Sequence, residues 1–351
     1  MTGALSFCMR VVFMGSSAAS ATCLRGILRE PALDVVGVVT QPDRPAGRGK
    51  VITPCPCKAY AVKRGVTEII TPENVNDPDV IERIASWKPD VIAVVAYGQF
   101  LGKKLLSLPL FGCINCHFSL LPKYRGASPV ASAIAAGDKM TGVTIMRMGE
   151  GMDDGPMLLQ SYEPIYSDVT SGEMMDNLAV SGAVTLAKAL ALMNRNALPP
   201  AVPQNPADAT YARKFKKTDG LIDWSEPVLV IERKIRAYSP WPGSYTFLPA
   251  RFRRKGNSGR VAVSSAEIVS VLEKEWKDAA PGTVLQTIAS VPKDARRDAS
   301  GREVRPGIVV KCGDTALKLT MLKPEGGSLM DGAAFLAGRP LAPFADSFLR
   351  E

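Results

Sequence analysis

The stretch that decides the fold reads Leu110-Phe111-Gly112-Cys113-Ile114-Asn115-Cys116-His117-Phe118-Ser119-Leu120-Leu121-Pro122-Lys123-Tyr124-Arg125-Gly126. Its first part, Leu110 to Ile114, is mostly apolar and predicts a buried strand. Asn115 and His117 come next, and side chains two residues apart on a strand share a face. The sequence therefore predicts a carboxamide and an imidazole side by side at the end of a buried strand. Ligand crevices form at such strand ends in open α/β sheets.

His117 is the one histidine among 351 residues. Any imidazole acid–base chemistry in this protein must therefore use it. The alternative interpretation is that Asn115 and His117 cap a strand for structural reasons. The Ser-Leu-Leu-Pro and Tyr-Arg-Gly segments that follow favour a shaped loop over a plain strand end.

A pair of carboxylates forms the second candidate group. Asp153 and Asp154 lie between glycines in Gly151-Met152-Asp153-Asp154-Gly155-Pro156-Met157, directly after the apolar run Val143 to Met148. Glycines permit a sharp turn there, and a carboxylate on the turn can be held against an imidazole. A solvated Asp-Asp-Gly turn is the competing interpretation of this segment alone.

Taken together, these segments resemble the folate-dependent formyltransferases. The family's core pattern is Asn-x-His-x-Ser-Leu-Leu-Pro followed by an Asp in a glycine-bounded turn, and here Asn115, His117, Ser119 to Pro122 and Asp153 match it. Further segments are similar to the branch of the family that formylates charged initiator tRNA: Thr40 to Lys50, Val94 to Gly98, Thr141 to Met146 and Ile222 to Ser225. The resemblance runs from about Arg10 to about Gly243 and continues weakly to the end.

The resemblance implies a reaction and a set of roles. A formyl group would pass from 10-formyltetrahydrofolate to the α-amine of methionine on initiator methionyl-tRNA, with no metal and no covalent enzyme intermediate. Asn115, His117 and Asp153 would be the catalytic residues. The expected folate-binding residues are Tyr97, Gly98, Ser119, Leu120, Leu121 and Pro122.

The segment Gln41 to Lys50 contains two prolines, two glycines and the cations Arg44, Arg48 and Lys50. This composition predicts an exposed loop rather than a helix or strand, and a solvated connector is the plain interpretation. The resemblance implies that the loop reaches the acceptor end of tRNA, chiefly through Arg48, with Arg125 in a similar role.

The positive charge of the chain is uneven. Residues 1 to 210 hold 19 basic and 18 acidic side chains, whereas residues 211 to 351 hold 24 and 16, which is net +8. A local positive field suits a polyanion-binding domain, although ordinary surface solubility explains it equally well. The expected contacts to tRNA in this part are the clustered cations Arg251, Arg253, Arg254 and Lys255.

Two domains of an α/β protein are expected from the length and the punctuation. The predicted boundaries are 1 to 197 for the catalytic domain, 198 to 210 for a linker with four prolines, and 211 to 351 for the C-terminal domain. The first part predicts strands at 10–14, 35–40 and 91–96 and helices at 23–30, 81–87, 130–136 and 171–195. The second predicts short strands at 261–272, 282–285, 308–310 and 317–321, consistent with a small β-barrel. The resemblance implies a Rossmann-like formyltransferase domain followed by an OB-fold-like tRNA-binding domain.

Seven cysteines, with no signal peptide and no apolar run near 18 residues, predict a cytoplasmic protein without disulfides, and a monomer is expected. Cys113 and Cys116 should face opposite sides of a strand, so no zinc site is expected there. Two alternatives remain open: a sugar-nucleotide or glycinamide ribonucleotide formyltransferase, and a non-catalytic RNA-binding protein. The first would not explain the cationic loop together with a basic C-terminal domain, and the second has no use for His117.

Overall fold

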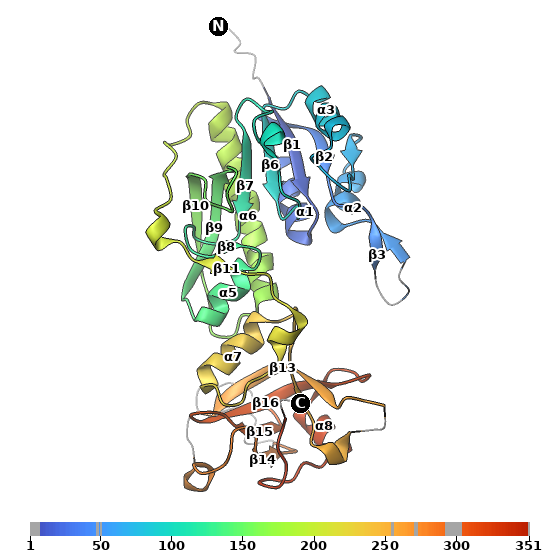
Figure 1. The fold of residues 1–351 in the computed structure, drawn as a ribbon, viewed down its shortest axis with the longest axis vertical. Coiled ribbons are helices and arrows are strands. Elements are labelled where there is room, and N and C mark those ends of the chain that lie inside the picture. The colour runs from blue at the N-terminus through green and yellow to red at the C-terminus, as the bar shows by residue number, and fades with distance from the viewer. Residues whose placement is uncertain are drawn as a thin grey trace. The chain divides into compact units, whose positions relative to one another are not determined.

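The computed structural model describes residues 8–46, 49, 51–253, 256–269, 273–291 and 304–349. They form two compact units (Figure 1). Unit 1 contains the chain up to Val130 together with Lys139–Tyr166 and Glu173–Arg213. Unit 2 contains Ala131–Asp138, Ser167–Gly172 and the chain from Lys214 onward.

A mixed sheet forms the centre of unit 1. Its strand order is β10-β9-β7-β6-β1-β2-β5, in which β9 is antiparallel to both of its neighbours, β7 and β10, and all other neighbouring strands pair in parallel. The strands are β1 (Met9–Gly15), β2 (Leu33–Val39), β5 (Ile69–Ile70), β6 (Val91–Val95), β7 (Cys113–His117), β9 (Met140–Arg147) and β10 (Met157–Pro164). All five residues of β6 are buried, as expected for a strand covered on both faces. The Rossmann-like α/β prediction is confirmed.

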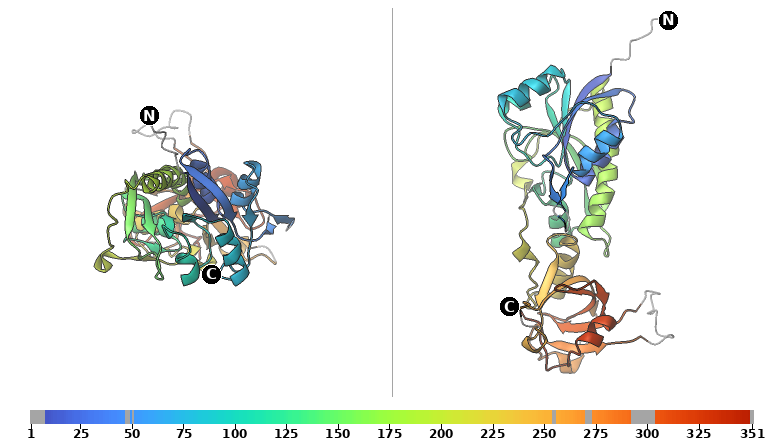
Figure 2. Two further views of the ribbon diagram at one scale, coloured as in Figure 1. Left: turned by 90° about the horizontal axis from the view of Figure 1, so that it is seen from above. Right: turned by 90° about the vertical axis from the view of Figure 1, so that its right-hand side faces the viewer.

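Helices cover both faces of this sheet (Figure 2). They are α1 (Ala18–Ile27), α2 (Pro56–Lys63), α3 (Pro78–Ser86), α4 (Lys103–Leu106) and α6 (Ser171–Asn194). Helix α5 (Pro129–Ala136) belongs mostly to unit 2. Helices α1 and α6 lie on one face. Gly182 of α6 packs so closely against the sheet that a Cβ added to it would lie 3.0 Å from the sulfur of Cys116. On the other face, Ile84 of α3 and Leu105 of α4 share a core cluster with Val12.

Some predicted boundaries shift for identifiable reasons. The strand expected from Leu110 begins only at Cys113, because Gly112 turns the chain at φ +73° and Leu110 is exposed. The helix expected at 23–30 begins at Ala18, since the Ser17 side chain accepts the backbone N–H of Ser20 and caps it.

Two predictions were wrong. Residues Arg44–Ala46 form strand β3, which pairs with β4 (Val51–Thr53), so part of the expected loop is a hairpin. Helix α6 does contain an apolar window of 18 residues that is long enough to cross a membrane. Half of that window is buried inside the protein, as in a core helix, because Leu178, Leu186 and Leu190 pack inward.

The proline-rich segment, residues 198–210, connects the two units but is not an unattached linker. Val202 forms a backbone bridge with Met157, and β11 (Tyr211–Ala212) pairs with β8 (Arg125–Gly126) in parallel. A short 3₁₀ turn spans Pro206–Asp208. The segment expected as a linker is therefore packed along unit 1, because its backbone groups find partners there.

Unit 2 is built on an antiparallel sheet of strand order β12-β13-β16-β15-β14, with β17 beside β16. Its elements are α7 (Val228–Ala237), β12 (Ser244–Phe247), β13 (Arg260–Val269), β14 (Val284–Ile288), β15 (Gly307–Lys311), β16 (Ala316–Pro324), β17 (Met330–Asp331) and α8 (Gly332–Gly338), with 3₁₀ turns at Lys217–Gly220, Ala250–Phe252 and Lys274–Trp276. The end of the chain bridges the two edge regions, because Leu349 pairs with Phe247 and Ser347 with Thr283. This arrangement agrees with the expected OB-like barrel.

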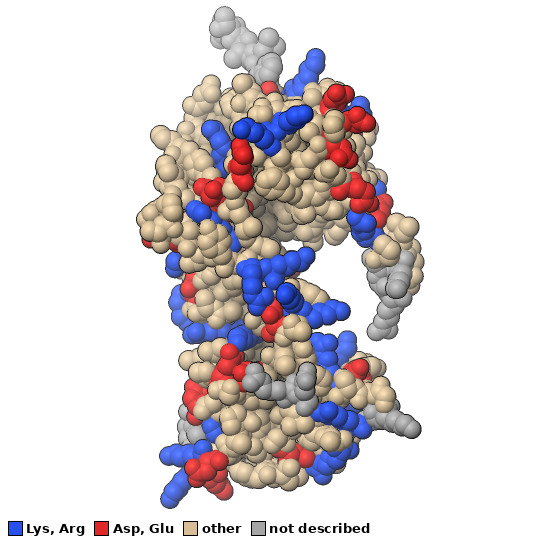
Figure 3. All heavy atoms as spheres, in the orientation of Figure 1, with Lys and Arg blue, Asp and Glu red and all other residues tan. Residues whose placement is uncertain are grey.

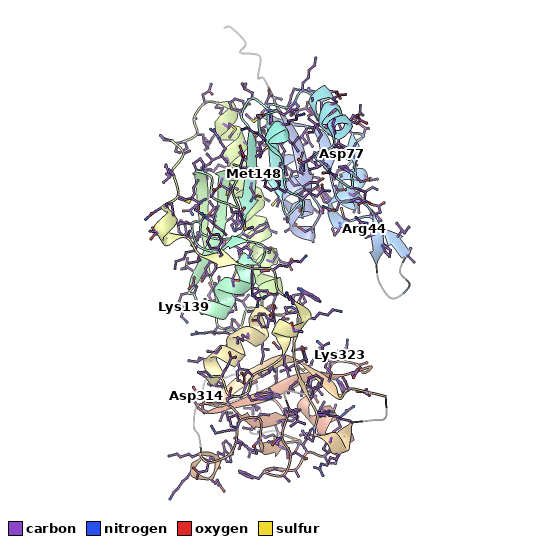
Figure 4. The ribbon with its side chains drawn as sticks, viewed as in Figure 1. Arg44, Asp77, Lys139, Met148, Asp314 and Lys323 are labelled. Atoms are coloured by element: carbon purple, nitrogen blue, oxygen red, sulfur yellow. The ribbon has the colours of Figure 1, made fainter. Side chains whose placement is uncertain are left out.

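One helix start in unit 2 is capped from a distant loop. Pro227 precedes α7 and its side chain offers no hydrogen bond. Instead the Asp314 carboxylate accepts the N–H of Val228 at 2.7 Å and that of Thr315 at 2.8 Å. Figure 4 marks Asp314 in this unit. Burial alone would raise the pKa of Asp314, but these N–H groups and Lys311 lower it below its ordinary value.

Candidate active site

Side chains alternate along strand β7, so Asn115 and His117 share one face with Cys113 while Cys116 faces the other side. Asn115 and His117 both reach the same carboxylate, Asp153, as their spacing predicts. Cys113 belongs to the core cluster of α3 and α4, whereas Cys116 lies against Gly182 of α6. The two thiols therefore face opposite sides of the sheet, which confirms that part of the sequence analysis.

Asp153 occupies the turn between β9 and β10 with a left-handed φ of +49°. A non-glycine residue rarely adopts that conformation, and surrounding contacts must hold it. The Asn115 amide donates to Oδ1 at 3.4 Å and the Gly126 N–H donates to Oδ2 at 2.8 Å. His117 Nδ1 lies 3.6 Å from Oδ2. Asp154, by contrast, is exposed.

His117 has a different neighbour at each ring nitrogen. Its Nε2 lies 2.9 Å from the carbonyl oxygen of Tyr124. Because a carbonyl only accepts hydrogen bonds, Nε2 carries a proton, and in the neutral ring Nδ1 is then the free base. The side chain of His117 is 7% exposed and that of Asp153 is 19% exposed. The arrangement offers a shielded base at Nδ1 beside a carboxylate.

Two residues that support Asp153 and His117 could not be predicted from the sequence. Gln204, in the proline-rich segment, donates from Nε2 to the carbonyls of Asp153 and Gly155, each at 2.8 Å, and accepts from Arg125 through Oε1. Tyr124 contributes only a backbone carbonyl. A glutamine among prolines and a main-chain oxygen carry no signal in the sequence, so only the fold reveals them.

The residues expected to bind folate lie around the carboxyl ends of β6 and β7. Several of them are buried or hydrogen-bonded within the protein. Ser119 is buried and its hydroxyl donates to the carbonyl of Lys123. Leu121 is buried too, with a cis peptide bond to Pro122, and Leu120 is half-buried. Gly98 is exposed in a left-handed conformation.

Tyr97 is also buried, and its hydroxyl has no hydrogen-bond partner among the described residues. Burial raises the pKa of its phenol. Its carbonyl accepts the Ser16 hydroxyl and the Gln41 amide, both at 3.3 Å. These contacts fix the backbone at the carboxyl ends of β1, β2 and β6.

The residues expected to contact tRNA in unit 1 differ in accessibility. Arg44, labelled in Figure 4, is exposed and pairs with Glu73 at 2.7 Å. Arg48 and Lys50 lie outside the described residues. The tRNA contact expected of Arg125 stays a prediction; its side chain is buried here, and both Nε and Nη2 donate to Gln204.

The cationic cluster in unit 2 has structural contacts of its own. Arg251 pairs with the buried carboxylate of Asp346 through Nε at 2.8 Å. Arg253 donates to the Leu248 carbonyl at 2.9 Å and has a buried Nη2. Arg254 and Lys255 lie outside the described residues. Elsewhere on unit 2, Figure 3 shows Lys and Arg side chains gathered along its right-hand edge.

No group of three or more His, Cys, Asp or Glu side chains in the described ranges is arranged to hold a metal ion. The thiols of β7 are also poor ligands as they stand, because burial raises the pKa of Cys113 to about 12. A hydrogen bond that the Cys116 thiol donates to Cys23, together with burial, raises the pKa of Cys116. Both sulfurs remain neutral and packed.

Comparison with known proteins identifies the two parts of the chain. Residues 9–190 match the family described as formyl transferase, and residues 214–340 match the formyl transferase C-terminal domain. A methionyl-tRNA formyltransferase of Marinobacter nauticus is 40% identical over 91% of this chain and 92% of its own length. One from Chloroflexus aggregans is 39% identical over 94% of this chain and 97% of its own.

Solved structures resemble the chain in fold. The N-formyltransferase from Helicobacter canadensis, solved in complex with folinic acid and dTDP-3-aminofucose, superposes with a TM-score of 0.56 at 15% identity. The match covers 89% of this chain and 98% of that one. At this identity the comparison supports a common architecture only.

Proposed function

The chain belongs to the methionyl-tRNA formyltransferase family, and from this premise we propose that it transfers the formyl group of 10-formyltetrahydrofolate to the α-amino group of the methionine carried by initiator tRNA, for translation initiation. The observation that carries the proposal is the geometry of His117: Nε2 is held by the Tyr124 carbonyl and Nδ1 faces Asp153. A base directed in this way suits removal of a proton from an amine.

The bond changes follow from that geometry. The amine nitrogen attacks the formyl carbon and gives a tetrahedral intermediate with negative charge on its oxygen. Asn115 donates a hydrogen bond to this oxygen, where charge develops. His117 accepts the amine proton at Nδ1, directly or through a water molecule, and Asp153 stabilises the imidazolium ion. The bond from carbon to N10 then breaks, and the proton passes from Nδ1 to N10.

The folate lies, in this proposal, beside the carboxyl ends of β6 and β7. The buried side chains of Tyr97, Ser119 and Leu121 shape the walls, and the exposed backbone at Gly98 supplies polar contacts. Leu120 and Pro122 complete the expected set. This position would place N10 of the folate next to Asn115 and His117.

We assign the chain up to residue 197 to catalysis and residues 211–351 to binding the tRNA body, with 198–210 as the connection. Net +8 in the second part supports this division, because phosphate contacts dominate non-specific affinity for nucleic acid. Arg48 and Lys50, which stand between β3 and β4 in the sequence, are proposed to contact the acceptor end. Arg251 and Arg253 have protein partners, so we keep only Arg254 and Lys255 of that cluster as candidate phosphate contacts.

The experiment is an assay of formyl transfer from 10-formyltetrahydrofolate to charged initiator tRNA, with a dTDP-amino sugar as the rival acceptor. Formylation of the tRNA alone supports the proposal. His117→Ala should lower kcat by roughly 100- to 10,000-fold, the range of a positioned acid–base group, while tRNA binding stays unchanged. Transfer to the sugar nucleotide but not to tRNA would contradict the assignment, as would near-normal turnover of the variant.

A further inference from the structure

A groove of about 560 Å³ runs between α1 and α6 on unit 1. Its α1 side is formed by Thr22, Arg25, Gly26 and Arg29, which recur at helical spacing and share a face. Its α6 side extends from Val180 to Arg195. At 1.5 Å per residue this side is about 22 Å long, so the groove is elongated.

The floor of the groove is apolar because the two helices approach closely. A Cβ on Gly26 would lie 2.8 Å from the Ala183 carbonyl, so only glycine permits this contact. Ala187 and Leu192 continue the floor. Val184 is 65% exposed although it lines the groove, which leaves apolar surface without a partner in the described part of the chain.

Cations surround this floor. Arg25, Arg29, Lys188 and Arg195 are exposed, and within the described ranges none of them forms an ion pair with a carboxylate. Glu30 is the one acidic side chain that lines the groove, and it accepts the N–H of Ala32 at 3.4 Å. The groove therefore lacks both a covering apolar surface and counter-charges.

The shape and the chemistry favour one kind of occupant. A bilayer surface cannot enter a concave floor between two helices. A nucleic-acid backbone would pair with the cations but gains nothing from alanine, valine and leucine. A helix with an apolar stripe at i, i+3, i+4 and i+7 and acidic flanks would fill the floor and neutralise the rim.

We propose that the groove between α1 and α6 binds an acidic amphipathic helix of a partner protein. Because the groove contains none of the residues that contact Asp153, this proposal is independent of the proposed formyl transfer. Occupation of the groove would attach the enzyme to a partner without blocking His117.

The test uses the full-length protein and a fluorescent synthetic peptide of roughly 15 residues, one groove length, with leucine on one face and glutamate on the other. A scrambled peptide of the same composition is its control. We expect the amphipathic peptide to bind at least about tenfold more tightly than the scrambled one, because only it presents a continuous apolar stripe.

Variants locate the binding site. Arg25→Glu with Lys188→Glu removes the complementary charge, and Ala187→Trp fills the floor without changing charge. Each should weaken binding of the amphipathic peptide by about tenfold or more. Lys63→Glu with Lys104→Glu, both exposed and outside the groove, is the matched control and should change the affinity less than about twofold.

Three results would overturn the proposal. One is equal binding of both peptides, which would indicate charge attraction alone. Another is an equal loss of affinity in the Lys63 and Lys104 variant. The third is a groove variant that loses affinity for an RNA oligonucleotide or anionic vesicles but keeps the peptide. Unchanged melting temperatures ensure that each variant is compared as a folded protein.

Discussion

At the level of single residues, the imidazole of His117 depends on groups outside its own strand. The Tyr124 carbonyl fixes one nitrogen and Asp153 faces the other. The pairing of His117 with a carboxylate of the Gly151–Gly155 turn could be predicted from spacing and resemblance. The Tyr124 contact could not, because a backbone acceptor is specified by the fold of the loop and not by a residue type.

The two adjacent aspartates give a matched comparison. Asp153→Asn should lower kcat severely, by about 100-fold or more, since the imidazolium ion would lose its neighbouring charge. Asp154→Asn should be mild, because that carboxylate is exposed. Steady-state formylation kinetics of both variants decide the matter, and the reverse ranking would assign the role to Asp154.

Asp314 gives a prediction on pH. The folded-state pKa of this carboxyl is lowered by the N–H groups of Val228 and Thr315. A lowered pKa contributes stability above the unfolded value of about 3.9 and loses it as the pH falls through the folded value. Asp314→Ala should therefore melt at a lower temperature than the parent at pH 7, by a modest margin because the group is exposed. The gap should narrow below about pH 4. A gap that is constant from pH 7 to pH 3 would show that the charge plays no part.

Among the structural elements, the turn that carries Asp153 is held by residues 198–210, which the amino-acid composition predicts to be a linker. Proline and exposed small residues predict irregular chain correctly, but they do not reveal that Gln204 enters the space behind Asp153. The hairpin at β3 and β4 was missed for a related reason. Short strands that pair only with each other are too brief for a periodic signal.

The proposed role of residues 41–50 can be tested by comparing Arg48 with Arg44. Arg48→Ala should raise KM for charged tRNA while folate affinity stays unchanged, since the lost cation would contact the acceptor end. Arg44→Ala is the matched control, because Arg44 is already paired with Glu73. Kinetics with each substrate varied separately give the measurement. A fall in folate affinity in the Arg48 variant would make the hairpin a wall of the folate pocket.

At the scale of the whole molecule, the sequence predicted both fold classes but not the division between units. Residues 131–138 and 167–172 belong with unit 2, and β11 belongs with unit 1. Single boundaries along the sequence cannot describe two units whose segments alternate along the chain. A chain ended near Ala209 would also lose the pairing of β11 with β8, so the role of the basic part is better tested in the full chain.

Salt dependence supplies that test. Binding of initiator tRNA should weaken linearly in log K against log salt, with a slope of about −0.9 for each phosphate neutralised on duplex. Replacing Arg254 and Lys255, the two retained candidate contacts, by alanine should flatten the slope by up to about two such increments. Filter binding or fluorescence titration at several salt concentrations measures the slope. An unchanged slope would remove both residues from the interface.

Because His117 is the one histidine of the chain, its imidazole can serve as a spectroscopic reporter of ligand binding. With one histidine in 37.5 kDa, a nitrogen-15 spectrum of histidine-labelled enzyme contains a single pair of ring signals, which need no assignment. The hydrogen bond from Nε2 to the Tyr124 carbonyl predicts that the neutral ring shows a protonated Nε2 and a bare Nδ1. Binding of folate, tRNA or the peptide would then be detected, or shown to be without effect, at the proposed catalytic base itself.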